Sequence, residues 1–312
     1  MMEPGIYTMP MSEYLSDPCA APSLSGGLAH TLLTRSPLHA WTEHPRLNKA
    51  FVPDAPTPEQ EEGTALHALI LENEDLTVVV DAPDWRTKAA QQARIAAREA
   101  GKIAILKARH AEIASVADDV RDQLRYHDDA RDILAAGKPE QTMIWQYQDI
   151  WVRNRVDWLD EDPRGWLTDI KTVATTAEPD AFGRKLVDSG YALSAALYLA
   201  GARALGRRPA GYRWLVVERD PPHAISVVAM APDLMDLAER QARRALDIWR
   251  ECMRTDTWPA YPPRTCYIEA PAWATMKWEE REERERTAPR ARPRPFHEAS
   301  DPRVTRSGMP FA

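Results

Sequence analysis

The sequence contains no run of apolar residues that approaches the roughly 18–20 needed to cross a bilayer, so we expect no transmembrane helix and no membrane partner. Its first residues, MMEPGIYTMPMSEYLSDP, contain neither a basic segment nor an apolar stretch, and therefore predict no signal peptide. With 44% hydrophobic and 28% charged residues, the composition is that of a soluble globular protein. Together these features predict a cytoplasmic protein.

Cysteine is scarce. The three cysteines, Cys19, Cys252 and Cys266, lie far apart in the sequence. Their odd number and wide spacing favour a reducing compartment over a disulfide-linked scaffold. Zinc and iron–sulfur sites normally need four ligands at short spacing, so we expect no metal site built from these residues.

An excess of positive charge is also missing, because the formal net charge of the 312 residues is -7. A protein that coats nucleic acid without specificity is normally basic over much of its surface. Any contact with nucleic acid must therefore come from a local basic patch, which remains compatible with an enzyme that has a basic groove.

The order of helical and β-prone segments predicts one α/β domain. Helical patterns cover residues 24–41, with a stop near Pro37, and residues 61–72, 180–205 and 234–253, with two or more further helices within 89–134. Strands are predicted over residues 141–148, 150–159, 166–172, 211–218 and 224–230, the first two as a hairpin. Residues 53–58 are predicted to be a linker. The domain is expected to cover residues 1–280, and the charged, proline-rich tail 281–312 is expected to be disordered.

The segment WLTDIKT, Trp166–Thr172, carries two charges inside a predicted strand. Residues two apart in a strand share a face, so Asp169 and Lys171 project together with the Ile170 carbonyl between them. If the turn DEDPRG makes this strand a neighbour of the preceding one, Asp157 converges on Asp169. Two carboxylates and a carbonyl oxygen would suit a hard cation such as Mg²⁺. Lys171 would then orient or deprotonate a water, or offset charge on a phosphate.

Each of these residues also has a simpler interpretation. A D-x-K tripeptide in a strand is usually a solvated face. His67 lies in GTALHALILE, on a helix whose other faces are apolar, where a histidine is more often a core residue. That helix precedes the three strands, however, and a neutral imidazole is a competent metal ligand. Glu140 opens the first strand, where most glutamates are simply solvated.

Taken together and in this order, GTALHALILE, EQTMIW, RNRVDWL and TDIKT resemble the PD-(D/E)XK nuclease superfamily. The resemblance is strongest to its exodeoxyribonuclease VIII (RecE-type) branch, and more distant to λ exonuclease and the RecB nuclease domain. It extends from about Pro22 to Tyr261. It implies a central mixed β-sheet flanked by helices, with a helical insertion.

The resemblance also implies roles for individual residues. Asp157 and Asp169 match the two catalytic acidic residues, Lys171 matches the lysine, and Glu140 matches a supporting glutamate. The metal, Mg²⁺ with Mn²⁺ as the alternative, would be held by His67, Asp157, Asp169 and the Ile170 carbonyl. The implied activity is digestion of double-stranded DNA from its ends, 5′ to 3′, which leaves a 3′ single strand for an annealing partner protein. Related nucleases form rings around DNA, which implies a homo-oligomer. They are encoded by bacteria or their phages, which implies a bacterial or phage origin.

Contacts with DNA are predicted at two groups of residues. The family helix that follows the D-x-K strand usually reads Tyr-x-x-Gln-x-x-x-Tyr, whereas this chain has Tyr191, Ser194 and Tyr198. Serine is shorter than glutamine, so a contact with DNA is either lost or bridged by water; packing is the alternative role for the tyrosines. The basic candidates for phosphate contact, each of which could equally be a solvated charge, are Arg86, Lys88, Arg153 and Arg155.

Three other functions are compatible with the same residues. A nuclease of this fold can act as an endonuclease or on single strands. A catalytically weak or silent member would bind DNA or a recombination partner, a reading that the missing glutamine favours and the intact set of His67, Asp157, Asp169 and Lys171 opposes. The third alternative is a globular protein in which these motifs occur by chance.

Overall fold

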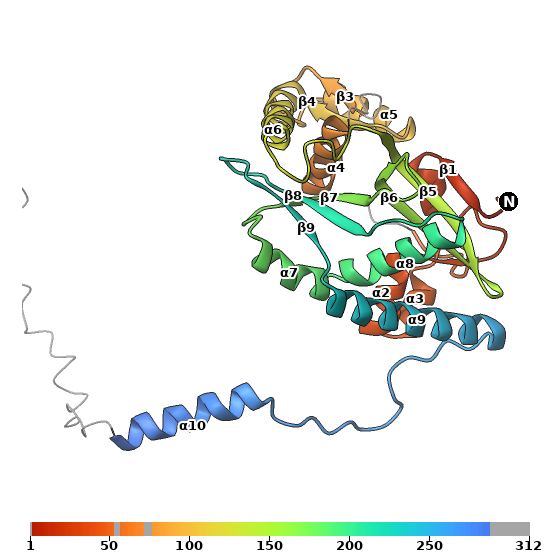
Figure 1. Cartoon of the computed structure of the whole chain (residues 1–312), viewed down its shortest axis with the longest axis vertical. Coiled ribbons are helices and arrows are strands. Elements are labelled where there is room, and N and C mark those ends of the chain that lie inside the picture. The colour runs from red at the N-terminus through yellow and green to blue at the C-terminus, as the bar shows by residue number, and fades with distance from the viewer. Residues whose placement is uncertain (1, 53–56, 72–76, 288–312) are drawn as a thin grey trace, which may run out of the picture. The chain divides into compact units, whose positions relative to one another are not determined.

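The computed structural model describes residues 2–52, 57–71 and 77–287, and it divides into two compact units, Met1–Tyr261 and Pro262–Ala312. The first unit is built on a seven-stranded sheet of order β1-β5-β6-β7-β8-β9, in which β2 also pairs with β6 (Figure 1). The β7–β8 and β2–β6 pairs are parallel and the others are antiparallel, so the predicted mixed sheet is confirmed. The strands are β1 (Gly5–Thr8), β2 (Ser23–Leu24), β5 (Gly137–Tyr147), β6 (Ile150–Asp160), β7 (Leu167–Val173), β8 (Tyr212–Glu218) and β9 (Ile225–Ala229).

Helices cover both faces of this sheet (Figure 1). One face packs on α2, α8 and α9, and the other packs on α4 and α6. A separate parallel pair, β3 (Thr77–Val80) and β4 (Ile103–Leu106), lies in the insertion between α4 and α6. The helices of this unit are α1 (Met11–Leu15), α2 (Gly26–Thr34), α3 (Pro37–Thr42), α4 (Pro58–Ile70), α5 (Lys88–Glu99), α6 (Lys107–Arg125), α7 (Pro179–Asp188), α8 (Tyr191–Ala204) and α9 (Pro232–Thr255).

The short helix predicted to stop near Pro37 is α2, which ends at Thr34. A second helix, α3, follows because Ser36 caps it and Pro37 begins it. Proline fits the first helical position, where its missing N–H is no loss. Residues 180–205 form α7 and α8, because Gly190 adopts a left-handed conformation with φ 70° that ends the first helix.

The helix that carries His67 was predicted, and its start has a clear local cause. The Thr57 side chain accepts a hydrogen bond from the Gln60 N–H, and the Gln60 side chain accepts one from the Thr57 N–H. This reciprocal pair satisfies two donors at the start of α4. The predicted linker 53–58 falls partly on residues 53–56, which lie outside the described residues.

The β5–β6 hairpin was also predicted and is long, whereas the β6–β7 ladder is short. Only Trp158 with Thr168 and Leu159 with Leu167 are paired between β6 and β7. The next pair in this register would be Asp157 with Asp169. The strands therefore separate at these two carboxylates, which places them in a split of the sheet.

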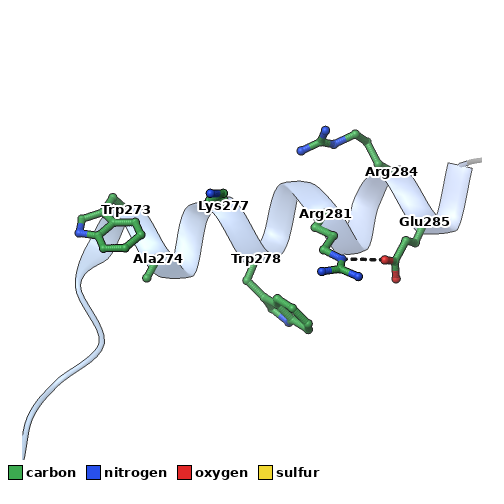
Figure 2. A pocket seen from close by; sticks show the side chains of 7 residues that line it. All are labelled: Trp273, Ala274, Lys277, Trp278, Arg281, Arg284 and Glu285. Carbon is green, nitrogen blue, oxygen red and sulfur yellow. Dashed lines mark hydrogen bonds and ion pairs between the residues drawn. The ribbon is translucent and has the colours of Figure 1, made fainter.

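The second unit contains α10 (Ala272–Thr287), which covers the first part of the tail predicted from residue 281. Pairs four residues apart support this helix, because Trp278 donates to Glu282 and Arg281 to Glu285, each at 2.8 Å; Figure 2 shows the second pair. Residues 288–312, the rest of the predicted disordered tail, lie outside the described residues. Across the residues that are described, no helix is both long and apolar enough to span a membrane.

Candidate active site

Asp157 and Asp169 face each other in the split between β6 and β7. The Ile170 backbone N–H donates a hydrogen bond of 2.7 Å to Asp157 Oδ2. A side-chain oxygen therefore satisfies a strand N–H at the point where the backbone ladder has ended. This bond fixes the Asp157 carboxylate against β7.

His67 reaches this carboxylate from α4. Its Nδ1 lies 3.7 Å from Asp157 Oδ2, and its side chain is 19% exposed. The helix passes close to β7, since a Cβ on Gly63 would lie 3.6 Å from Thr172 Oγ1. Burial, and then the Lys171 cation, lower the pKa of His67 to about 4, although Asp169 acts in the opposite direction. The imidazole is therefore neutral near pH 7, as a metal ligand must be.

Lys171 forms an ion pair with Asp169 and donates a hydrogen bond of 3.3 Å to the Ile170 carbonyl. Its ammonium nitrogen lies 5.3 Å from the centre of the Tyr191 ring, within range of a cation–π contact. Burial lowers the pKa of Lys171, but Asp169 and Asp157 raise it more, so that the pKa lies above its ordinary value. Lys171 is accordingly a stable cation.

The single positive charge of Lys171 does not balance the two carboxylates of Asp157 and Asp169. Burial raises the pKa of Asp169, the Asp157 carboxylate raises it further, and Lys171 only partly offsets both, so the pKa is about 7. Burial also raises the pKa of Asp157, against a lowering by Lys171. Two buried carboxylates beside one ammonium form a site that a further cation would stabilise.

Glu140 lies on β5, opposite Asp157 of β6. The register pairs Pro139 with Trp158 and Gln141 with Val156, and between them Glu140 adopts a left-handed conformation with φ 54°. Its Oε2 accepts a hydrogen bond of 2.6 Å from Arg155 Nε. Glu140 thus adds negative charge near Asp157, and Arg155 holds it in place.

Among the described residues, no group of three His, Cys, Asp or Glu side chains is arranged to hold a metal ion. In chemical type the donors do fit a hard divalent cation: they are a neutral imidazole, two carboxylates with raised pKa values and a backbone carbonyl. The Asp169 carboxylate forms an ion pair with Lys171, and the Asp157 carboxylate accepts a hydrogen bond from the Ile170 N–H. The structure therefore places His67 beside Asp157 and Asp157 beside Asp169, but it does not arrange all three side chains around one point.

The three predicted residues of α8 differ in their surroundings. Tyr191 lies over Lys171, as described above. Tyr198 packs edge-on against Tyr212, with ring centres 5.7 Å apart. Ser194 lies against α2, where its Oγ would be 2.6 Å from a Cβ on Gly26. Tyr191 lies over the Lys171 ammonium, whereas Tyr198 hydrogen-bonds with the Arg155 backbone, and burial together with Asp169 and Asp157 raises its pKa well above the ordinary value.

The predicted phosphate contact at Arg153 is wrong, because this side chain is buried. Its guanidinium donates to the carbonyl and hydroxyl oxygens of Ser23, at 3.0 and 2.6 Å, and to the Tyr14 carbonyl at 3.1 Å. Arg153 and Asp157 are four residues apart in β6 and so share a face of the strand, but the N-terminal segment covers β6 at Arg153. Arg155 is mostly buried as well, and its NH1 donates to the Met9 carbonyl at 2.7 Å.

Arg86 and Lys88 are exposed at the start of α5. The Arg86 side chain is 92% exposed, and its Nε lies 3.7 Å from Asp84. Both remain accessible to a large anionic ligand.

Tyr212 is a residue of the site that the sequence did not identify. It lies on β8 beside β7, its pKa is raised well above its ordinary value by burial and by Asp169, and it makes a side-chain hydrogen bond with Asp169. The alternation of Tyr212 and Trp214 in a strand predicts one shared face. Their position beside Asp169 depends on the parallel pairing of Asp169 with Trp214, which the sequence does not reveal.

The match to a family model agrees with this fold. Residues 31–271 match the family described as a PDDEXK-like domain of unknown function (DUF3799). Among curated proteins, none matches this sequence. A crystal structure from Eubacterium rectale, of a protein with the provisional name of exonuclease, has 11% identity and a TM-score of 0.49, and the match covers 86% of this chain and 97% of that one. A phage-related exonuclease from Haemophilus somnus has 13% identity and a TM-score of 0.28, covering 62% and 95% of the two chains. Since both scores lie below 0.5, the family match alone assigns the fold.

Proposed function

This chain belongs to the DUF3799 family of PDDEXK-like domains, within the PD-(D/E)XK nuclease superfamily, and on that premise we propose that it is a metal-dependent exodeoxyribonuclease. Its substrate is double-stranded DNA, which it degrades from the ends in the 5′ to 3′ direction, leaving 3′ single strands for recombination. The observation that carries this proposal is the meeting of His67, Asp157, Asp169 and Lys171 where β6 and β7 separate.

The metal ligands would be His67, Asp157, Asp169 and the Ile170 carbonyl. A divalent cation bound in such a site, Mg²⁺ or Mn²⁺, supplies polarisation of the phosphate and a lowered pKa of water. Asp157 and Asp169 offer it the negative charge that Lys171 leaves uncompensated.

Lys171 acts as a cation in this proposal. Its pKa lies above the ordinary value, which makes the ammonium a poor base at neutral pH. It instead donates a hydrogen bond to the scissile phosphate and offsets the charge that grows on it in the transition state. Tyr191 keeps the ammonium in position, and Glu140, held by Arg155, maintains the negative potential around Asp157.

Arg86 and Lys88 would contact phosphates outside the site, since they are exposed and cationic. Ser194 and Tyr198 would influence the grip on DNA only through the position of α8. We further propose that the catalytic domain covers residues 1–280, that the protein forms a homo-oligomer, such as a ring around DNA, and that it works in the bacterial cytoplasm beside a single-strand annealing protein.

One digestion experiment tests this function. The purified protein is incubated with linear and with covalently closed circular duplex DNA, in Mg²⁺ or in EDTA, beside Lys171→Ala. We expect Mg²⁺-dependent loss of the linear DNA only, reduced about 10²-fold or more in the variant.

Two other outcomes contradict the proposal. Cutting of the closed circle identifies an endonuclease. A salt-sensitive gel shift without digestion identifies a DNA-binding protein.

A further inference from the structure

Tyr212 buries a hydroxyl group beside the candidate active site. Its side chain is 3% exposed and belongs to the main hydrophobic core. Phenylalanine has the same ring without the hydroxyl, and a buried hydroxyl costs free energy unless it is hydrogen-bonded. The hydroxyl of Tyr212 makes its hydrogen bond with the Asp169 side chain. The polar atom of this core residue is therefore directed at a proposed metal ligand.

The sheet order places Tyr212 and the split on opposite sides of Asp169. Strand β7 lies between β6, from which it separates, and β8, which carries Tyr212 (Figure 1). The parallel register pairs Asp169 with Trp214, and Tyr212 precedes Trp214 by two residues, so its side chain shares their face of the sheet. Asp169 thus has the split and Asp157 on one side and Tyr212 on the other.

The direction of this hydrogen bond follows from the chemistry of the two groups. An ionised carboxylate has no proton and can only accept hydrogen bonds, whereas a phenol donates one. In the form of the protein that can bind a cation, Tyr212 is therefore the donor and Asp169 the acceptor. The bond fixes the carboxylate from the β8 side and leaves it free to accept a cation from the split.

Neighbouring aromatic rings hold Tyr212 in place. The Tyr198 ring packs edge-on against it with centres 5.7 Å apart, and the Trp214 ring centre lies 5.0 Å away. Trp214 in turn lies 6.4 Å from Phe182, which stacks on Tyr191 at 6.4 Å. These separations are those of favourable aromatic pairs. We call the four residues Tyr212, Trp214, Phe182 and Tyr191 the aromatic row.

The two ends of the aromatic row contact the two members of one ion pair. Tyr212 bonds with Asp169, and the Tyr191 ring centre lies 5.3 Å from the Lys171 ammonium. Asp169 and Lys171 pair with each other. A cation at Asp169 would compete with Lys171 for the carboxylate, but not with Tyr212, which approaches from the other strand. Tyr212 can therefore keep Asp169 oriented when the ion pair is exchanged for a metal ion.

We propose that Tyr212 is a positioning residue of the metal site, whose hydroxyl donates a hydrogen bond to Asp169 and determines how this carboxylate meets a divalent cation. The inference rests on the proposed function, in which Asp169 is a metal ligand. Tyr212 itself contacts neither the cation nor the DNA. Loss of a hydrogen bond to a ligating group typically weakens metal binding about 10- to 100-fold.

Tyr212→Phe tests this role, because it removes the hydroxyl and keeps the ring. Isothermal titration calorimetry measures the affinity of the full-length protein for Mn²⁺, without DNA and at one fixed pH. The variant should bind Mn²⁺ about ten-fold more weakly, or worse. Tyr198→Phe is the matched control, since it makes the same change in the neighbouring ring, whose hydroxyl bonds with the Arg155 backbone. This control should bind Mn²⁺ as the wild type does.

The electron paramagnetic resonance spectrum of bound Mn²⁺ separates positioning from packing. It reports the arrangement of ligands around the ion, and at saturating Mn²⁺ it does not depend on affinity. Tyr212→Phe should change this spectrum, and Tyr198→Phe should not. Circular dichroism without metal checks that both variants are folded.

Two results would overturn the proposal. One is a Tyr212→Phe protein with the affinity and the spectrum of the wild type. The other is an equal loss of affinity in Tyr198→Phe, because the effect would then come from the packing of the rings.

These results can be separated from those of the proposed function, because the measurements need no DNA. If the protein digests no duplex DNA but Tyr212→Phe loses Mn²⁺ affinity, the positioning role stands and the nuclease fails. If duplex DNA is digested and Tyr212→Phe binds Mn²⁺ normally, the nuclease stands and this inference fails. A wild-type protein that binds no Mn²⁺ would contradict both.

Discussion

At the scale of single residues, Arg153 belongs to the interior of the protein. Its NH1 lies 3.5 Å from Asp17 Oδ1, and the Asp17 side chain is fully buried. Burial raises the pKa of Asp17, but bonds from His44 and Ser23 and the charge of Arg153 lower it more, so the pKa lies below its ordinary value. Asp17 is therefore an ionised buried carboxylate that His44, Arg153 and Ser23 stabilise together.

Replacing Arg153 should consequently affect stability. Arg153→Leu leaves the Asp17 charge without this partner, and breaking a buried pair in this way costs about 3–5 kcal/mol of unfolding free energy. Arg86→Ala removes an exposed charge and should cost less than about 0.5 kcal/mol, while it weakens binding to duplex DNA. Urea unfolding and anisotropy on both variants check this. A fully stable Arg153→Leu protein with weakened DNA binding would contradict the assignment.

Asp169 should make metal binding depend on pH. With a pKa of about 7, its carboxyl is protonated below pH 7 and must lose the proton before it can bind a cation. Affinity for Mn²⁺ should therefore rise about ten-fold per pH unit up to about pH 7 and level off above it. The pKa of His67, about 4, keeps this residue neutral throughout that range. Calorimetry without DNA measures the affinity, and a constant value between about pH 5.5 and 7 would refute the expectation.

At the scale of helices and strands, the close contact between α2 and α8 depends on the small side chain at Ser194. A Cβ on Gly26 would lie 2.6 Å from Ser194 Oγ and 3.0 Å from its Cβ. The two helices therefore approach closely because residue 26 has no side chain. This close packing limits the size of the side chain at position 194, because a longer side chain there would have to displace α2.

A double-mutant cycle tests this close approach. Gly26→Ala should lower the free energy of unfolding by about 1–3 kcal/mol, because it overpacks the contact. In a Ser194→Gly background the same change should cost clearly less, since the opposing atoms are gone. Urea denaturation gives all four values. Strictly additive costs would show that the two residues do not determine the distance between these helices.

Local patterns explain why most of the sheet could be predicted. The β5–β6 hairpin and β7 follow from β-prone runs and the turn at Asp160–Gly165, and α4 follows from its helical pattern. By contrast, β1 has only four residues and gains its place by pairing with β5, far along the chain. The short β4 lies within residues 89–134, where helical spacing dominated, and β3 (Thr77–Val80) was not predicted.

The candidate site could be predicted for a similar reason. Asp157, Asp169 and Lys171 lie on strands that adjoin in sequence, so alternation and one turn were enough to bring them together. The burial of Arg153 could not be predicted, because it depends on the fold of the N-terminal segment over β6. Tyr212 depends equally on a parallel pairing between distant strands.

At the scale of the whole molecule, the two units differ in what they contain. Every buried core residue among those described lies in Met1–Tyr261, as do all the candidate catalytic residues. The second unit contributes α10, which buries none of its residues. Folding and phosphodiester chemistry should therefore reside in the first unit.

Truncation after Tyr261 tests this division. The shortened protein should unfold within about 2 °C of the full chain, because it loses no residue of the hydrophobic core, and about 1 kcal/mol corresponds to 2–4 °C at this size. Thermal denaturation followed by circular dichroism measures this. Digestion of duplex DNA should persist. A large loss of stability would instead show that residues after Tyr261 contribute to the folding of the first unit.

The central claim is that His67, Asp157 and Asp169 hold a divalent cation at the split between β6 and β7. Anomalous diffraction from crystals grown with Mn²⁺ tests it most directly. We predict one peak about 2.0–2.3 Å from a carboxylate oxygen of Asp157 and of Asp169, with Lys171 turned away from Asp169. No peak at this position, at a Mn²⁺ concentration that supports DNA digestion, would contradict the account.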